Sequence, residues 1–400
     1  MIDVVSLGTA LRVPDSAQAA LDAADCVIGG ERHLAAVASR AAECLPIPSP
    51  LADLATLIDT RRDRKLVVLA SGDALFFGIA NFLLRHVAPG ELTFHPNVTS
   101  VQTACARVGR PWSDLVTLSL HGRPLSRLRA AICDAVSLAI YTDSINTPVR
   151  VASELVELGY ADSRITVFEA LDSEAECIST HRAGELAEKA TEFNPLNLLL
   201  VDVAGPGGLL PVFPGIPDAT FGAEGDTQFT KREVRLAALS RLALGRGQVG
   251  WDIGAGSGGF AIEWARWHRA AEVFAVERDP VRCARFEANR ARFGDHGNLT
   301  LIEGPAPSAL TDLPAPDAVF VGGTGGDPDA VLDACVDALK PGGRLVAAGV
   351  TVETRASLTQ RTWPGDTEFC EIVVSYSAPL GSQTTMRSRL PVLLATMVKA

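Results

Sequence analysis

Short β-branched runs alternate with helix-length segments along most of this 400-residue chain. Parallel strands joined by crossover helices produce such an alternation, so it restricts the chain to the α/β class. In the first half we expect strands at 3–7, 25–30, 65–71, 91–96, 137–142, 164–171 and 197–203. Helices are expected between some of them, over 15–24, 51–62 and 77–87.

A change of composition divides the chain near its middle. Residues 204–226 hold six glycines and four prolines in 23 residues, which is typical of a connection between domains. A chain of 400 residues is also too long for one ordinary core. We therefore predict a first domain over 1–204, a linker over 205–222 and a second domain over 223–400.

The alternation restarts beyond this break. An amphipathic helix is expected over 229–244, with Thr230 as its N-cap and Glu233 at the spacing of a capping box. Five strands separated by helix-length segments follow, at 248–254, 272–277, 299–304, 317–323 and 344–350. The runs 370–378 and 390–398 predict two more strands, joined by a loop, that close the sheet as an antiparallel pair.

The stretch "WDIGAGSGGF" (251–260) places several glycines where a strand turns into a helix. Glycine permits positive φ there and lets a ligand approach the backbone closely. The next strand ends in Glu277, and an acid at that point can accept both hydroxyls of a ribose. Asp252 is positioned to meet the amino group of the ligand, directly or through water. Because an antiparallel tail closes the sheet, an S-adenosylmethionine (SAM) methyltransferase fits better than a dehydrogenase.

The segments "FTKREVRLAALSRLAL", "WDIGAGSGGFAIEWA", "AVERDP", "LIEGPAPSAL" and "VFVGGTGG" resemble the decarboxylating precorrin methyltransferase domain of cobalamin biosynthesis. The resemblance covers most of 224–400 and implies a Rossmann-like class I SAM-dependent methyltransferase fold. One position departs from the family, since Pro305 stands where aspartate is common. Pattern and resemblance together give a SAM site made of Thr230, Asp252, Gly254, Ala255, Gly256, Ser257, Gly258, Glu277, Gly304 and Ala306.

The first half resembles the tetrapyrrole methylases, in "ADCVIGGERHL", in "LASGDALFFGIA" and over 94–123. That family has a two-lobed α/β fold with SAM in the cleft between the lobes. The resemblance implies SAM contacts at Gly72, Asp73, Phe76, Thr99 and Ser100, and a cleft lined by His121, Gly122 and Arg123. Helix capping is the alternative role for Asp73, Thr99 and Ser100. The loop after the first strand departs from the family, because it holds one glycine, Gly8.

Two unlike SAM folds in this order resemble the fused precorrin methyltransferases of the aerobic vitamin B12 route. The resemblance implies methylation of precorrin-6B at carbons 5 and 15 and loss of carbon dioxide from the acetate on carbon 12, giving precorrin-8X. It assigns carbon 5 to the first domain and the other two events to the second. It further implies one SAM per domain, a tetrapyrrole as the partner molecule, and a homo-oligomer, with a tetramer through the second domain as one form.

The acceptors in such a substrate are carbons of an electron-rich ring, so alignment with the sulfonium is the main requirement. We therefore expect neither a metal nor a covalent nucleophile. The substrate carries many carboxylates, which cationic side chains bind well. Candidates in the second domain are Lys231, Arg232, Arg235, Arg387 and Arg389.

Composition excludes several other classes. The net charge of −11 argues against sequence-independent nucleic-acid binding, which needs a basic field. No apolar run is long enough to cross a bilayer, and "MIDVVSLGTA" does not have the pattern of a secretory signal. The eight cysteines form no C-x-x-C pair, which makes a structural zinc site or a disulfide framework unexpected. A cytoplasmic location is expected.

Two alternative functions stay open at the level of sequence. In the first, the second domain alone is catalytic and the first is a lobe that binds tetrapyrrole, because its glycine loop is missing. In the second, the chain is a nucleic-acid methyltransferase with an accessory module. The acidic charge and the sequence "VGGTGGDP", which stands where amino-group methyltransferases of nucleic acids carry a [DNS]-P-P-[YF] motif, disfavour the second alternative.

Overall fold

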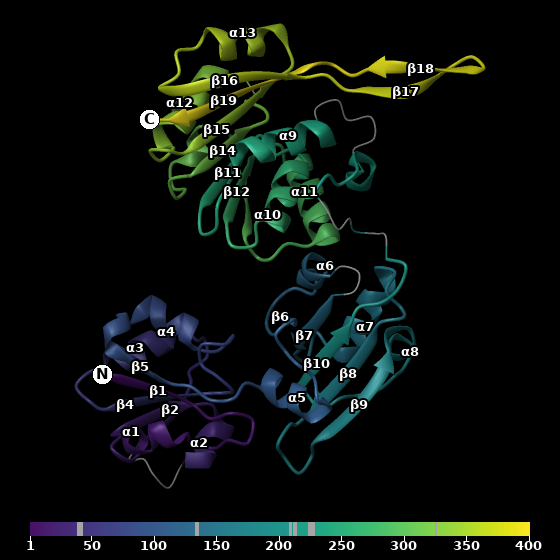
Figure 1. The fold of residues 1–400 in the computed structure, drawn as a ribbon. Helices are drawn as coiled ribbons and strands as arrows, with labels where there is room; N and C mark the ends of the chain where they lie inside the picture. The colour runs from purple at the N-terminus through teal and green to yellow at the C-terminus, as the bar shows by residue number, and fades with distance from the viewer. Residues whose placement is uncertain (38–42, 133–135, 208–209, 211–213, 223–228, 325) are drawn as a thin grey trace. The chain divides into compact units, whose positions relative to one another are not determined.

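The computed structural model in Figure 1 describes the residues 1–37, 43–132, 136–207, 210, 214–222, 229–324 and 326–400. The chain forms two compact units. The first comprises Met1–Arg123 and Asp134–Pro206, and the second comprises Pro124–Cys133 and Gly207–Ala400. Within the described ranges, no helix is both long and apolar enough to span a bilayer.

The first unit begins with a fully parallel sheet in the order β3-β2-β4-β1-β5. Its strands are β1 (Ile2–Ser6), β2 (Cys26–Gly29), β3 (Cys44–Pro46), β4 (Leu66–Ala70) and β5 (Leu92–His95). The helical elements around it are η1 (Asp15–Ala17), α1 (Gln18–Asp22), α2 (Glu31–Val37), α3 (Asp53–Asp59), α4 (Ala80–His86) and η2 (Pro89–Glu91). The parallel strands expected at 3–7, 25–30, 65–71 and 91–96 are therefore confirmed.

Helices cover both faces of this sheet because successive strand residues point to opposite sides. Val4 and Val68 pack in one cluster with residues of α3 and α4. Val5 and Val67 pack in a second cluster with residues of α1 and α2. Near-continuous apolar runs are the sequence signature of strands buried on both faces.

The second sheet of this unit runs in the order β6-β7-β10-β8-β9. Its strands are β6 (Val116–Ser119), β7 (Ser137–Tyr141), β8 (Arg164–Glu169), β9 (Cys177–Arg182) and β10 (Asn197–Asp202). Only β6 and β7 form a parallel pair among them, so the expectation of parallel strands is wrong here. The connection 170–176 between β8 and β9 is too short for a crossover helix and forces an antiparallel pair. The helices around it are α5 (Ser100–Val108), α7 (Pro148–Glu157) and α8 (Ala183–Ala187). The helix α6 (Arg127–Ala131) lies in the segment Pro124–Cys133, which belongs to the second unit.

The second unit is built on a seven-stranded sheet in the order β13-β12-β11-β14-β15-β19-β16. The first five are parallel, and β19 is antiparallel to both of its neighbours. The strands are β11 (Val249–Ile253), β12 (Glu272–Glu277), β13 (Leu299–Glu303), β14 (Ala318–Val321), β15 (Arg344–Gly349), β16 (Gly365–Ile372) and β19 (Val392–Lys399). The strand order reverses between β11 and β14, and ligands of open α/β sheets bind beyond the carboxyl ends of the strands at that point.

Helices pack on both faces of this sheet as well. They are η3 (Asp218–Phe221), α9 (Arg232–Leu242), α10 (Gly259–Trp267), α11 (Pro280–Phe293), η4 (Ser308–Leu310), α12 (Pro328–Ala338) and α13 (Val352–Gln360). The core joins Trp251 and Val319 of the sheet to Val331 and Cys335 of α12. These helices position the loops at the carboxyl edge of the sheet, where the glycine turn lies.

The predicted antiparallel closing pair is confirmed in β16 and β19, but the connection between them is not a simple loop. It forms a separate hairpin of β17 (Ser375–Leu380) and β18 (Gln383–Ser388). Figure 1 shows this hairpin projecting from the body of the second unit. The run predicted as one strand over 370–378 is broken between Ile372 and Ser375 for that reason.

The expected N-cap of the helix over 229–244 is wrong. The helix α9 begins at Arg232, its N-cap is Lys231, and no side-chain hydrogen bond is made by that cap. Instead, the Asp218 carboxylate accepts a hydrogen bond from the backbone N–H of Arg232 at 3.0 Å. An acceptor from another segment therefore satisfies a donor that the Thr230 hydroxyl was expected to satisfy.

Candidate functional site

The glycine turn at the carboxyl end of β11 adopts the backbone conformation that its sequence predicts. Gly254, Gly256 and Gly258 have φ values of +74°, +58° and +87°. A Cβ atom on Gly254 would lie 2.4 Å from the carbonyl oxygen of Gly323, so backbone from the loop after β14 occupies that side. A Cβ atom on Gly256 would meet no protein atom within 4 Å. The open side of the turn is therefore at Gly256.

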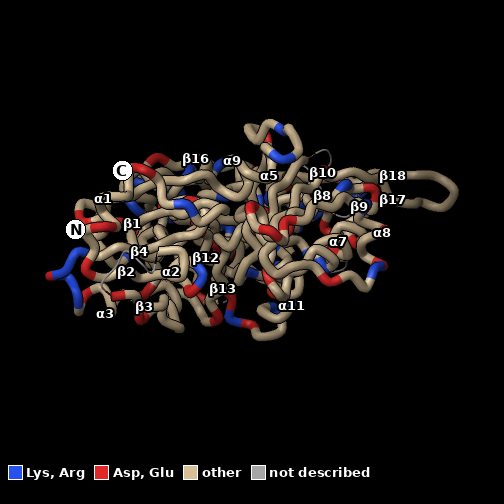
Figure 2. Tube along the Cα trace, turned by 90° about the horizontal axis from the view of Figure 1, so that it is seen from below, with Lys and Arg blue, Asp and Glu red and all other residues tan. Residues whose placement is uncertain are grey.

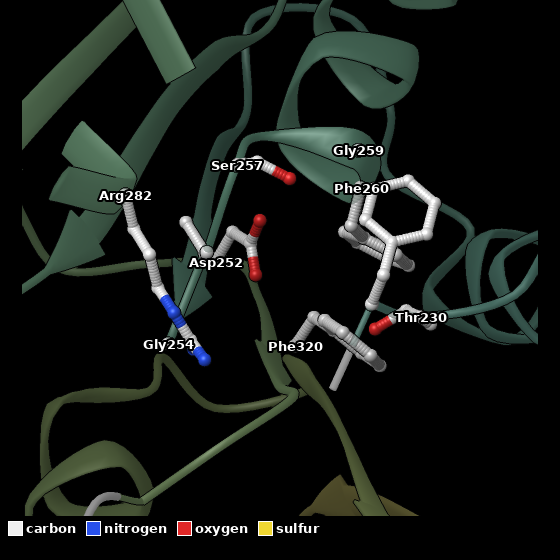
Figure 3. Close-up of a pocket in the computed structure, with 11 residues that line it drawn as sticks. Thr230, Asp252, Gly254, Ser257, Gly259, Phe260, Arg282 and Phe320 are labelled. Atoms are coloured by element: carbon white, nitrogen blue, oxygen red, sulfur yellow. The ribbon is translucent and has the colours of Figure 1, made fainter. Parts of the chain in front are cut away.

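A pocket that is partly open to solvent lies beside this turn (Figure 3). Six of the predicted SAM contacts line it: Thr230, Asp252, Gly254, Ala255, Gly256 and Ser257. Strand β11 supplies Asp252, the turn supplies the next four, and Thr230 precedes α9. The structure thus brings together residues from separate parts of the chain at one edge of the sheet.

Asp252 is the most unusual group in the pocket. Its side chain is buried, with a relative exposure of 1%. Among the described residues, no donor meets either carboxylate oxygen with the geometry of a hydrogen bond. Burial raises the pKa of Asp252 to about 8, while the backbone N–H of Ala261 opposes the rise and the negative charge of Glu277 adds to it. A buried acceptor without a donor is costly, so this carboxylate is suited to a ligand that brings a donor or a positive charge.

Four predicted SAM contacts do not line the pocket, namely Gly258, Glu277, Gly304 and Ala306. They lie around the same edge of the sheet. The Glu277 carboxylate accepts a hydrogen bond from the N–H of Gly256 at 2.8 Å, and the Glu277 carbonyl accepts one from the N–H of Gly304 at 2.9 Å. Glu277 also accepts from the N–H groups of Arg278 and Asp279. Its carboxylate therefore anchors the glycine turn to the end of β12.

Five residues that line the pocket are absent from the sequence-based prediction: Phe229, Gly259, Phe260, Arg282 and Phe320. Phe260 and Phe320 stack with ring centroids 3.8 Å apart and an angle of 12° between the planes. Both lie next to predicted glycine segments, in "SGGF" and "VFVGG", so their closeness in sequence to these glycines could have indicated that they line the pocket. Arg282 comes from α11, and Figure 3 shows it on the opposite side of Asp252 from Thr230. No motif marks Arg282 in the sequence.

In the first unit, predicted donor contacts meet at the carboxyl ends of β4 and β5. Gly72 has a φ of +59°. A Cβ atom there would lie 3.8 Å from the Cα of Thr99 and 3.9 Å from the backbone nitrogen of Ser100. Thr99 is the N-cap of α5 in a capping box with Gln102, so the capping role considered for it is present. Gly8, in the loop after β1, forms an isolated bridge with Gly72.

Aromatic side chains extend this group toward the second sheet of the same unit. The Ser100 hydroxyl donates a hydrogen bond to the Tyr141 hydroxyl at 3.1 Å. The ring of Tyr141 lies 6.5 Å from that of Phe76 and 6.0 Å from that of Phe77. The guanidinium carbon of Arg123 lies 5.8 Å from the centre of the Phe77 ring. Predicted residues from both lobes therefore converge here, and Phe77 and Tyr141 are additions that only the structure reveals.

The remaining predicted residues of the first unit make local contacts. The Asp73 carboxylate accepts a hydrogen bond from the N–H of Leu75, and α4 begins only at Ala80, so Asp73 does not cap that helix. His121 Nδ1 lies 3.4 Å from the carbonyl oxygen of Thr142. The N–H of Gly122 donates to the Asp143 carboxylate at 2.8 Å.

Of the five cations expected to bind substrate carboxylates, four lie beside an aromatic ring or an acidic residue, and the fifth, Arg235, is fully buried. Lys231 lies 5.6 Å from the centre of the Phe229 ring, and Arg232 pairs with Glu233 at 3.2 Å. Arg387 lies opposite Tyr376 in the β17–β18 hairpin, and Arg389 lies 5.6 Å from the centre of the Tyr376 ring.

Arg235 differs from the other four cations because protein surrounds its side chain. The prediction that it binds substrate at the periphery is wrong, because its side chain is fully buried. Its guanidinium donates to the carboxylates of Glu263 and Asp218 and to two backbone carbonyl oxygens, so acceptors inside the unit satisfy it.

A parallel sheet with this strand order, a glycine turn after its first strand and a buried acid beneath the turn define a class I methyltransferase of the kind that uses SAM. The first unit, with two α/β lobes, is of a different fold. Two family models match the chain. Residues 14–187 match the tetrapyrrole (corrin/porphyrin) methylases, and residues 220–399 match the precorrin methyltransferase domain.

Similar proteins span both halves or one of them. The precorrin-6Y C(5,15)-methyltransferase (decarboxylating) of Sinorhizobium sp. is 38% identical over 381 residues, covering 94% of this chain and 91% of that protein. In Salmonella typhimurium, a cobalt-precorrin-7 C(5)-methyltransferase is 35% identical and covers 44% of this chain and 89% of its own length. A cobalt-precorrin-6B C(15)-methyltransferase (decarboxylating) from the same organism is also 35% identical, covering 42% and 88%.

One solved structure is a further match. The C-terminal domain of precorrin-6Y C5,15-methyltransferase from Rhodobacter capsulatus is 32% identical, with a TM-score of 0.43, and covers 48% of this chain and 100% of that chain. The chain belongs to the family of precorrin-6Y C(5,15)-methyltransferases (decarboxylating).

The geometry of the glycine turn gives a first prediction. Gly256→Ala adds a methyl group that meets no protein atom but stands beside the pocket. We expect it to weaken SAM binding by more than about tenfold. Because alanine is strained at the positive φ of this position, the free energy of unfolding should also fall by about 1–2 kcal/mol. Calorimetric titration and thermal unfolding measure the two effects.

The matched control for this prediction is Gly258→Ala. Its methyl group would lie 2.7 Å from Phe286 and 2.8 Å from Ile262, so it should lower the stability more than Gly256→Ala does. Native affinity for SAM in Gly256→Ala would show that the open side of the turn does not face the donor.

Proposed function

We propose that this chain methylates precorrin-6B at carbons 5 and 15 and removes carbon dioxide from the acetate on carbon 12, giving precorrin-8X. Membership of the family and the match along nearly the whole chain support this substrate. The observation that carries the proposal is the buried carboxylate of Asp252 beside the open side of the glycine turn. We assign the ammonium group of one SAM to this carboxylate and a second SAM to the region where Gly72, Thr99 and Ser100 converge.

The first unit, in this proposal, methylates carbon 5, and the second methylates carbon 15 and decarboxylates. Two separate relatives, each covering less than half of this chain, carry the C(5) name and the C(15) decarboxylating name. The two activities therefore exist on separate proteins elsewhere. The aromatic group of Phe76, Phe77 and Tyr141, with Arg123 beside it, offers flat apolar faces and one cation to a planar polycarboxylate.

The two methyl transfers need alignment more than acid–base catalysis. Loss of carbon dioxide leaves an electron pair that the conjugated ring accepts, and a proton then adds to the side-chain carbon in place of the carboxyl group. Bound SAM supplies an electrophilic methyl group, and the acceptor carbon is already a nucleophile because ring nitrogens push electrons toward it. The task of the protein is to hold the two reactants in line and to exclude water. Asp252 binds the ammonium end of the donor, and the stack of Phe260 and Phe320 forms an apolar wall of the pocket.

Mass spectrometry of the product tests the function directly. The full chain, given SAM and a metal-free precorrin-6B, should yield a product with two added methyl groups and one carbon dioxide lost. With SAM near the KM of the unaltered chain, Asp252→Asn should strongly slow one methylation and the decarboxylation and leave the other methylation unchanged, because only the second unit is affected. Gly72→Ala, which narrows the gap to Thr99, should remove the other methyl group. A product of Asp252→Asn that still loses carbon dioxide at the native rate would overturn the division between the units.

The pKa of Asp252 predicts how SAM binding depends on pH. The carboxyl group is protonated below about pH 8 in the free protein, whereas binding an ammonium favours the carboxylate. Binding must then release a proton below pH 8, and affinity should rise as the pH approaches 8. Above that pH an α-amino group, with an ordinary pKa of about 8, loses its own charge, so affinity should fall again.

Calorimetry in buffers of different ionisation enthalpy measures both the affinity and the released proton. In Asp252→Asn the rise on the acidic side should vanish, and affinity at pH 8 should fall about 30-fold, since losing one partner of a buried charge pair costs about 2 kcal/mol. An affinity that does not change between pH 6 and pH 8 in the unaltered chain would refute the assignment of Asp252 to the ammonium group.

We also propose that the chain forms a homo-oligomer through the β17–β18 hairpin. A two-stranded hairpin is marginally stable by itself. Leu380 and Met386 in it are 61% and 64% exposed. Residues 375–386 hold no charged side chain, and Figure 2 shows no charge along the outer hairpin. An uncharged projecting arm with exposed apolar side chains suits a second copy of the same arm.

Charges placed on the hairpin should therefore separate the subunits. Leu380→Asp together with Met386→Asp is expected to yield monomers by analytical ultracentrifugation, because two carboxylates cannot be buried in an apolar interface without loss of most of its free energy. Ile145→Asp, at an exposed isoleucine of the first unit, should leave the assembly unchanged. If the double variant sediments like the unaltered chain, the hairpin is not the interface.

Two further features support the proposed setting. The described cysteines are all free thiols, which fits a reducing compartment such as the cytoplasm. Acidic and basic residues are interspersed along the trace in Figure 2, with a net charge of −11 for the whole chain. The net negative charge does not favour a nucleic acid as the methyl acceptor, and family membership favours a tetrapyrrole.

A further inference from the structure

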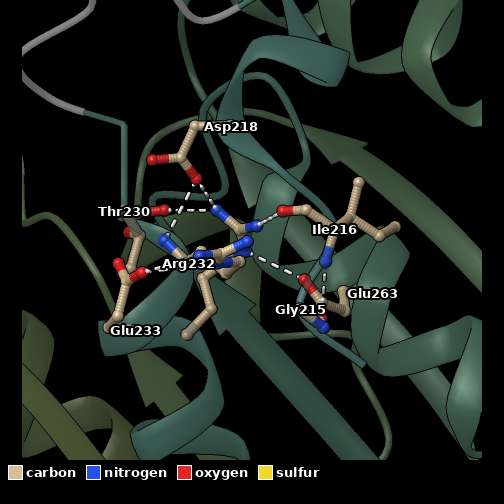
Figure 4. Close-up of polar contacts among 8 residues, drawn as sticks. Gly215, Ile216, Asp218, Thr230, Arg232, Glu233 and Glu263 are labelled. Atoms are coloured by element: carbon tan, nitrogen blue, oxygen red, sulfur yellow. Dashed lines mark hydrogen bonds and ion pairs between the residues drawn. The ribbon is translucent and has the colours of Figure 1, made fainter. Parts of the chain in front are cut away.

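Arg235 holds one end of the second unit together from a fully buried position (Figure 4). Its Nε donates to the Glu263 carboxylate at 2.9 Å. One terminal nitrogen donates to the Asp218 carboxylate and to the Thr230 carbonyl, each at 2.7 Å. The other donates to the carbonyl oxygen of Ile216. The guanidinium thus joins four acceptors from three separate segments of the chain.

The surroundings of Arg235 reinforce these bonds. Its guanidinium carbon lies 5.2 Å from the ring centre of Phe221 and 5.2 Å from that of Phe229, and the two rings are 5.4 Å apart. The Glu263 side chain is also fully buried, and it accepts hydrogen bonds from the N–H groups of Gly215 and Ile216. A segment expected to be a linker is thereby fixed to α9 and α10.

This network reaches the donor pocket through two adjacent residues. Phe229 and Thr230 both line the pocket. Phe229 contacts the cation through its ring, and Thr230 contacts it through its carbonyl oxygen. The Phe229 ring also packs on the first turn of α10, where a Cβ atom on Gly259 would lie 2.4 Å from it. The position of this wall of the pocket therefore depends on what Phe229 and Thr230 are attached to.

Stability alone does not require a buried guanidinium at this place. Buried ion pairs can often be exchanged for apolar side chains without loss of stability, because taking the two charges out of water offsets their attraction. What an apolar side chain cannot do is direct hydrogen bonds to several segments at fixed angles, and a lysine offers a single nitrogen for the task. Because the N–H groups of Arg235 bond to three segments, the guanidinium fixes the positions of these segments relative to one another.

We propose that Arg235, held by Glu263 and Asp218, is a positioning residue of the donor site in the second unit. It fixes Phe229 and Thr230 as one wall of the pocket and makes residues 214–222 part of the donor-binding structure. Arg235 does not touch the donor or the acceptor. The inference rests on the proposed function only in that the pocket beside Asp252 is taken to be a SAM site.

The test separates position from stability. In the double variant Arg235→Met with Glu263→Gln, both charges are removed and the Gln side chain still accepts from Gly215 and Ile216. We expect the melting temperature to change by only a few degrees, while the KM for SAM in the methylation at carbon 15 rises about tenfold. The kcat at saturating SAM should fall less than threefold, because the reacting groups are intact.

Two further variants complete the design. Arg241→Met is the matched control on the same helix, since Arg241 pairs with the exposed Glu368 at 3.3 Å and should leave both constants unchanged. Asp218→Asn keeps the Arg235–Glu263 pair and weakens one tie, so it should raise the KM about threefold and serves if the double variant does not fold.

A folded double variant, or a folded Asp218→Asn, with native KM for SAM would overturn the inference, as would a loss confined to kcat. Asp252→Asn provides the reference for the site itself. If Asp252→Asn leaves the same KM unchanged, the proposed donor site is wrong. If it raises the KM and the variants of the Arg235 network do not, only the positioning role fails.

Discussion

Parallel pairing brings the carboxyl ends of all strands of a sheet to the same edge, and both candidate sites depend on it. In the first unit this constraint places Gly72, after β4, near Thr99, after β5. In the second it places the glycine turn after β11 beside Gly323, after β14. The loops have little in common as sequences. Their meeting is a consequence of strand direction and strand order alone.

Two buried ionisable side chains, Asp252 and Arg235, have different roles in the second unit. Asp252 is desolvated without a hydrogen-bond donor at bonding geometry among the described residues, and its carboxyl group therefore takes a raised pKa. Arg235 is equally buried, but protein acceptors in several directions meet its hydrogen-bond donors. The first arrangement leaves free energy to be gained from a cationic ligand. Arg235 makes its hydrogen bonds to protein acceptors and, in our proposal, fixes one wall of the pocket.

Several residues predicted for the second site lie together in the structure, because they are close in sequence. Gly254, Gly256 and Asp252 lie within a few positions of each other, so strand, turn and helix could be read from one stretch. Arg282 and Phe320 could not be found in this way, since they enter from other elements. The role of Arg235 was predicted wrongly for the same reason. An arginine near a helix start gives no sign that Asp218 and Glu263 will fold against it.

The sequence by itself determined the α/β class and the glycine turn, because strand and helix periods and turn chemistry are properties of neighbouring residues. Its resemblance to two families implied the two different methyltransferase folds. Only the tertiary structure decided the antiparallel pairing of β10, the helix start at Arg232 and the burial of Arg235. Each of these depends on which distant segment supplies a hydrogen-bond partner or excludes water. That choice is made by packing in three dimensions, where sequence distance has no meaning.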